Sequence, residues 1–150
     1  MPDFYSIQDV LTFAIHLEQA SQEFYRRLSR TVHSPSVSRF LTELVKEEQR
    51  HEQQLTQLLT GSGGVPESQI SSDQVDCYVQ AIKVSESMDY KEAVKLAMDK
   101  EKAAQMLYSV IAGVMEDPIL LDVFQQLSAQ EKIHRQFFEN EYQQICLSEN

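Results

Sequence analysis

Cysteine, glycine and proline are scarce in this sequence of 150 residues, and each scarcity excludes something. The two cysteines, Cys77 and Cys146, are too few for a disulfide framework or a four-thiolate metal site. We therefore expect free thiols and a cytoplasmic location. Four glycines and four prolines leave room for few turns, which favours long helices.

Long apolar runs and positive charge are also lacking. No run of 18 apolar residues is present, so we expect no membrane-spanning helix. The first residues, MPDFYSIQDV, lack the basic start and apolar core of a signal peptide. Lys and Arg total 13 against 23 Asp and Glu, a formal net charge of −10. This acidic balance argues against nucleic acid and anionic membrane surfaces as partners.

The spacing of the apolar residues is helical, and it predicts an all-α fold, a four-helix bundle. Long helices are expected over residues 6–31, 34–61, 89–116 and 117–146, and a short amphipathic one over 74–86. Ser6 and Asp89 stand where N-caps belong, and Pro35 and Pro118 occupy first helical positions, which tolerate proline.

The connections between the expected helices predict the topology. Short links join the first two helices and the last two, so each pair should form an antiparallel hairpin. The length fits one domain with a continuous core. We expect a single domain over 1–150, with hairpin one at 6–61, a long crossover at 62–88 and hairpin two at 89–146.

The second hairpin repeats the first with an offset of 83 residues and no gap. Pro35 matches Pro118, and Tyr25 matches Tyr108. Six ionisable residues also recur: Glu18, Glu48 and His51 in hairpin one, and Glu101, Glu131 and His134 in hairpin two. Each lies in the middle of an apolar stripe that a bundle must bury.

Carboxylates in an apolar core need a compensating charge, because an unpaired one costs several kcal/mol or takes up a proton. Two divalent cations would balance the four glutamates with both histidines neutral. Glu and His three residues apart share one helix face, as a common metal requires. Oxygen donors with one imidazole per metal favour iron or manganese, and zinc also accepts them. A metal-free network of hydrogen bonds is the alternative, but it leaves excess negative charge in the core.

Small residues and tyrosines accompany the central glutamates. The small side chains stand one turn to either side of these glutamates: Ala14, Ser21, Ala97 and Ala104. They leave room for metals and bound oxygen species. Tyr25 and Tyr108 stand two turns away from the glutamates, where a hydroxyl can reach a ligating carboxylate. Core packing alone explains the two tyrosines equally well.

The segments AIHLEQASQEFY, EEQRH, EKAAQMLY and EKIH resemble the ferritin-like superfamily of di-iron carboxylate proteins, and within it the rubrerythrin-like branch. The pattern E…ExxH…E…ExxH covers residues 7 to 145. The resemblance implies two iron ions, with Glu18 and His51 on one, Glu101 and His134 on the other, and Glu48 and Glu131 bridging. It further implies that the ferrous centre reacts with hydrogen peroxide or dioxygen, as a peroxidase or ferroxidase.

The sequence departs from rubrerythrins proper at three points. Ala104 stands where they carry an additional carboxylate, which puts efficient peroxide reduction in doubt. The chain has no paired CxxC motifs of a rubredoxin domain, so a separate electron-donor protein would have to supply electrons. The helical hairpins are shorter than those of cage-forming ferritins, which argues against a 24-subunit shell. Related bundles pair side by side, so a homodimer is expected.

Two other functions stay open at this point. Ala104 and the missing electron-transfer domain favour a metal-binding or iron-handling helical bundle without catalytic turnover. A metal-free helical interaction domain is the third reading. The three differ in metal stoichiometry, in turnover and in the effect of a chelator on stability.

Overall fold

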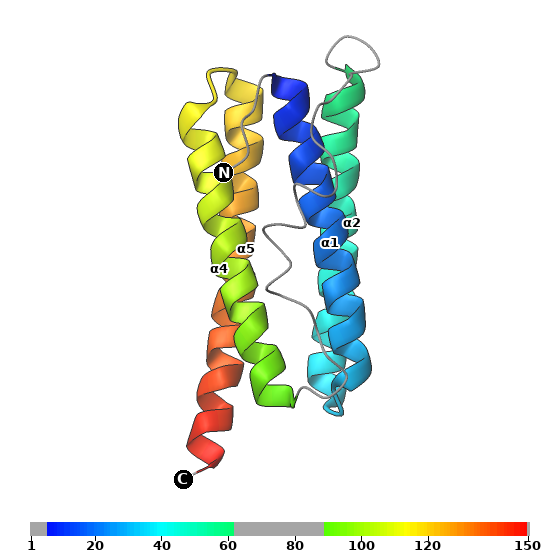
Figure 1. Ribbon diagram of the computed structural model, residues 1–150, viewed down its shortest axis with the longest axis vertical. Helices are drawn as coiled ribbons and strands as arrows, with labels where there is room; N and C mark the ends of the chain where they lie inside the picture. The colour runs from blue at the N-terminus through cyan, green and yellow to red at the C-terminus, as the bar shows by residue number, and fades with distance from the viewer. Residues whose placement is uncertain (1–5, 62–88, 150) are drawn as a thin grey trace. The chain divides into compact units, whose positions relative to one another are not determined.

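A computed structural model describes residues 6–61 and 89–149, and these residues form four α-helices and no strand. The helices are α1 (Ile7–Thr31), α2 (Pro35–Gly61), α4 (Tyr90–Val114) and α5 (Pro118–Ser148). The chain divides into two compact units, Met1–Glu86 and Ser87–Asn150, and each holds one antiparallel helical hairpin (Figure 1). The short helix expected over 74–86 and Cys77 lie outside the described residues. None of the four described helices is long and apolar enough to cross a membrane.

Local capping interactions fix where the helices of hairpin one begin. The Ser6 hydroxyl accepts a hydrogen bond from the backbone N–H of Asp9 at 3.1 Å, which satisfies one free donor at the start of α1. α2 begins at Pro35, as expected for a proline at the first helical position. The core of hairpin one contains large apolar side chains with at most 1% exposure: Leu11, Phe13, Leu28, Leu41, Leu44 and Leu55.

Hairpin two uses the same devices with aspartate caps. The Asp89 carboxylate accepts from the N–H of Glu92 at 2.8 Å. Asp117 accepts from two N–H groups at the start of α5, at 2.8 and 3.2 Å. α4 ends at Val114, two residues before the expected end, because the backbone of Met115 is already extended. Pro118 also disfavours a helical backbone at Asp117, the residue before it. α5 runs two residues past the expected end at Cys146.

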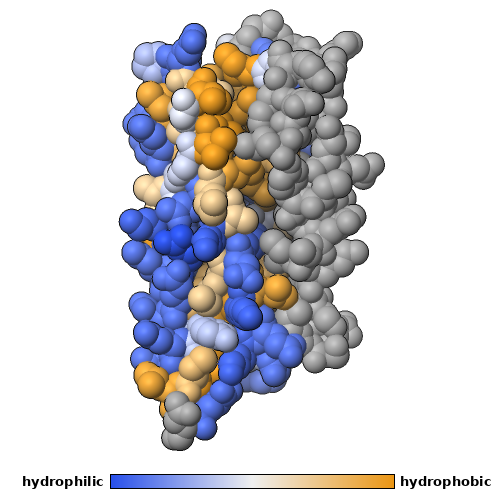
Figure 2. All heavy atoms as spheres, turned by 60° about the vertical axis from the view of Figure 1, so that its left-hand side comes forward, coloured by the Kyte–Doolittle hydropathy of each residue, from blue (hydrophilic) through white to orange (hydrophobic). Residues whose placement is uncertain are grey.

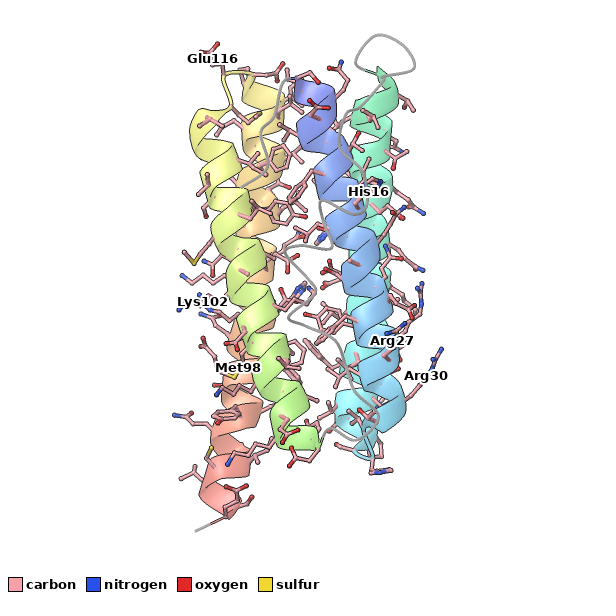
Figure 3. The ribbon with its side chains drawn as sticks, viewed as in Figure 1. His16, Arg27, Arg30, Met98, Lys102 and Glu116 are labelled. Atoms are coloured by element: carbon pink, nitrogen blue, oxygen red, sulfur yellow. The ribbon has the colours of Figure 1, made fainter. Side chains whose placement is uncertain are left out.

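The repeat does not extend to the exposed faces of the two hairpins. On α4 the exposed side chains Met106, Val110 and Val114 form an apolar stripe, and Figure 2 shows apolar surface gathered toward the α4–α5 connection. Offset by 83 residues, the first two match Glu23 and Arg27, an exposed ion pair with 2.8 Å between charged atoms. Arg27 points away from α1 in Figure 3. The two hairpins therefore share core positions but present different surfaces.

Candidate metal centre

Hairpin one brings its three predicted ligands together. Glu18 comes from the middle of α1, and Glu48 and His51 come from one face of α2. Their exposed fractions are 1%, 0% and 6%. One ligand atom from each lies within 4.8 Å of the others. The imidazole Nδ1 of His51 faces the Glu18 carboxylate, 3.4 Å from Oε1.

Hairpin two repeats this cluster one helix pair later. Glu101 comes from α4, and Glu131 and His134 come from one face of α5. All three are buried, and their ligand atoms also lie within 4.8 Å of one another. His134 Nδ1 lies 3.8 Å from Glu101 Oε2 and 3.6 Å from Glu131 Oε2. The same ring nitrogen therefore faces the carboxylates in both hairpins.

Each cluster has a donor set and spacing that suit a divalent cation. Two ligands on one octahedral ion with bonds of about 2.1 Å lie roughly 3 Å apart. The 3.4 Å between His51 Nδ1 and Glu18 Oε1 is close to this value, and the separations in hairpin two require a small contraction. Two carboxylates are hard donors, and together with one neutral imidazole they accept iron, manganese or zinc. The residues thus fit a metal in each hairpin, while their role as ligands stays a prediction.

In the metal-free protein, burial and neighbouring charges shift the pKa values of the three ionisable groups in the hairpin-two cluster. Burial, together with the charge of Glu131, raises the pKa of the Glu101 carboxyl well above its ordinary value. Burial would also raise the pKa of Glu131, but the neighbouring side chains of Glu101 and His134 and the charge of Lys100 lower it to about 2. Burial would lower the pKa of His134, yet the neighbouring carboxyl groups of Glu101 and Glu131 raise it to about 11. Bound protons thus supply the positive charge that a metal would otherwise bring.

A buried lysine, Lys100, adjoins the second cluster and was missed by the sequence interpretation. It is 4% exposed, and its Nζ lies 3.6 Å from Glu101 Oε1. The charge count from the sequence, two divalent cations against four glutamates, therefore leaves out the positive charge of Lys100. The repeat itself carried the signal, because the 83-residue offset places Lys100 on Leu17, a buried apolar position of α1.

The residues expected around the ligands are buried as well. Tyr25 and Tyr108 are 0% and 1% exposed, and their rings contact Phe24 and Phe124 with centroid separations of 5.2 and 6.0 Å. Aromatic packing therefore contributes to their burial. Their hydrogen bonding to a ligating carboxylate stays a prediction. The four small side chains next to the central glutamates are all buried, at 0% to 5% exposure: Ala14, Ser21, Ala97 and Ala104.

Solved structures share this architecture. A dodecameric thioferritin, the bacterioferritin-related protein from Bacteroides fragilis, has a TM-score of 0.81 at 20% identity, covering 98% of this chain and 90% of that one. A hypothetical protein from Pyrococcus furiosus has a TM-score of 0.71 at 20% identity, covering 93% and 89%. The predicted fold class, a ferritin-like four-helix bundle, is therefore confirmed.

The family follows from the sequence. The model of the Rubrerythrin family matches residues 9–145, so the chain belongs to the rubrerythrin family. No curated protein matches the chain.

The protons held in hairpin two predict how the metal-free protein responds to pH. Glu101 and His134 both bind protons more tightly in the folded state than in the unfolded state. The stability this provides is lost as pH rises, and for His134 the window is between about 6.5 and 11. In the presence of chelator, the free energy of unfolding should fall by about 1.4 kcal/mol per pH unit for each such proton. Urea unfolding between pH 6.5 and 9 measures this slope.

Matched variants identify the source of the slope. His134→Gln should flatten it, whereas His33→Gln, on an exposed histidine outside the cluster, should not. Added metal should show the opposite trend, since its affinity should rise about tenfold per pH unit for each proton it displaces. A metal-free stability that is constant or rises across this pH range would contradict the assignment.

Proposed function

We propose that the protein is a di-iron oxidoreductase that reacts ferrous iron with hydrogen peroxide or dioxygen. The observation that carries this proposal is the buried Glu, Glu and His cluster, which occurs once in each hairpin at matching positions. Membership in the rubrerythrin family supports it. The resemblance to di-iron carboxylate proteins adds to the proposal that the two clusters share a pair of ions.

In this proposal each cluster would provide the ligands of one ion and one bridging glutamate. We assign the central glutamate and the histidine of each hairpin to one ion, and the second glutamate to a bridge between the ions. The terminal pairs are Glu18 with His51 and Glu101 with His134, and the bridges are Glu48 and Glu131. Carboxylate ligands stabilise the higher charge of ferric iron, because they are hard anionic donors. They therefore favour the oxidation of bound ferrous iron.

The chemistry comes from the metal, and the chain positions and encloses it. Two ferrous ions would supply two electrons that, with two protons, reduce one hydrogen peroxide to two water molecules. The small side chains beside Glu18 and Glu101 leave space at the ions for the oxidant. In our proposal the hydroxyls of Tyr25 and Tyr108 hydrogen-bond ligating carboxylates and hold their orientation. A separate electron-donor protein returns the centre to the ferrous state.

Loading with iron tests the redox function directly. The anaerobic protein with two equivalents of ferrous iron should consume peroxide or oxygen and gain near-ultraviolet absorption from ferric iron. Glu48→Ala should remove most of the iron affinity and the reaction, because a bridging ligand is lost. Glu43→Ala, an exposed glutamate paired with Lys46, is the control and should react like the wild type.

Turnover separates this proposal from the second candidate, a metal-binding bundle without catalysis, which Ala104 favours. Excess reductant and peroxide should give many turnovers per protein if the chain is an enzyme. Consumption that stops after the bound iron is oxidised once, with any electron donor, would favour the metal-handling bundle.

Removing metal tests whether the clusters bind ions at all. Free metal at 100 times its dissociation constant should raise the free energy of unfolding by about 2.7 kcal/mol, and a chelator should abolish the gain. Thermal unfolding with and without chelator measures the difference. An unfolding temperature that ignores both metal and chelator would favour the metal-free helical interaction domain instead.

We also propose that copies of this chain associate. Support comes from the B. fragilis neighbour, which is a dodecamer, and the sequence analysis expects a homodimer. Light scattering coupled to size-exclusion chromatography should give a mass that is a multiple of 17.3 kDa. A mass of one chain across the micromolar range would contradict association.

A further inference from the structure

Lys100 is a buried cation inside a region that the proposed function reserves for metals. Its side chain is 5% exposed, and its Nζ lies 3.6 Å from Oε1 of Glu101, whose side chain is fully buried. Lys102, two positions further along α4, is exposed and points away from the helix in Figure 3. Removing an ammonium group from water is costly unless a carboxylate compensates it. The burial of Lys100 therefore depends on the negative charge of this cluster.

The internal repeat shows that Lys100 breaks the equivalence of the two clusters. Both predicted glutamate ligands, the histidine and the tyrosine are identical between the hairpins at the 83-residue offset. At the position before the central glutamate, hairpin one has Leu17, which is 7% exposed. Hairpin two has a buried lysine there instead. Leu17 and Lys100 can be compared directly, because each stands next to the same candidate ligands within one chain.

This difference changes the charge that each cluster offers to a cation. Hairpin one presents two carboxylates and one imidazole. Hairpin two presents the same three groups together with the ammonium of Lys100, so a cation at Glu101 meets one unit less of negative charge. Like charges a few ångströms apart repel strongly where water is excluded. An incoming ion must overcome this repulsion or displace the ammonium from Glu101.

We propose that Lys100 makes the two metal positions unequal: the Glu18–His51 position fills first and tightly, and the Glu101–His134 position binds its ion more weakly. This inference rests on the proposed function, since it assumes that both clusters bind metal. At low metal concentration the protein then holds one ion, and the second enters only at higher concentration. Charge repulsion of this kind should separate the two affinities by about 100-fold.

Titration of the metal-free full chain with Co²⁺ tests the inequality, followed by visible absorption and by calorimetry. The wild type should show two steps separated by about 100-fold. His51→Ala should remove the tight step, and His134→Ala the weak one. A single step in which the wild type binds two ions with equal affinity would overturn the inference. So would loss of the weak step in His51→Ala and of the tight step in His134→Ala.

Variants of the lysine test its cause. Lys100→Leu gives hairpin two the residue that hairpin one carries, and it should tighten the second step until the two steps merge. Lys100→Arg keeps the charge and should keep two steps, whereas Lys102→Leu removes an exposed charge and should change neither. If Lys100→Leu fails to fold, Lys100→Met gives an unbranched apolar side chain of similar length for the same measurement.

The outcomes separate this inference from the proposed function. A second step of unchanged affinity in the folded apolar variant would overturn the role of Lys100, while two bound ions would leave the proposed function standing. A wild type that binds one ion beside a Lys100→Leu variant that binds two would support the role in its strongest form. Failure of the wild type and the variant alike to bind any ion would remove the proposed function itself.

Discussion

The structure depends on one electrostatic constraint, which is the burial of two carboxylates within each helical hairpin. Glu18, Glu48, Glu101 and Glu131 are each at most 1% exposed. Such groups persist in a core only when positive charge or a proton compensates them. The raised pKa of Glu101, the raised pKa of His134 and the burial of Lys100 are three expressions of this requirement.

The internal repeat gives two helical hairpins with the same buried cluster, and the hairpins differ at other positions. The helix starts, the central glutamates and the Glu–His pairs recur at identical spacing, because the same backbone geometry must present them. Away from these positions the copies diverge. An exposed ion pair on α1 matches an apolar stripe on α4, and buried Leu17 matches buried Lys100. Since the candidate ligands are identical in the two hairpins, these differences are what distinguish one half chemically from the other.

Two departures act in the same direction on hairpin two. Ala104 removes a carboxylate that the resemblance to rubrerythrins leads one to expect, and Lys100 adds an ammonium beside Glu101. Both reduce the negative charge near the Glu101–His134 cluster. In our proposal, a cation there would be held by fewer anionic groups than in rubrerythrins proper, so its affinity and its tendency to be oxidised should both fall. This direction of change suits an iron-handling role at least as well as rapid peroxide turnover.

The sequence by itself determined the helices and the candidate ligands. Caps such as Ser6 and Asp89 and prolines at first positions act within a few residues, and apolar periodicity is a local signal, so the helix starts could be predicted closely. The repeat likewise identified six ligand candidates without any contact information. The tertiary structure decided which imidazole nitrogen faces the carboxylates, in which direction the pKa values of hairpin two shift, and that Lys100 is buried beside Glu101 while Lys102 is exposed. These depend on groups brought together by the folding of each hairpin, whose separations in space cannot be read from their separations along the chain.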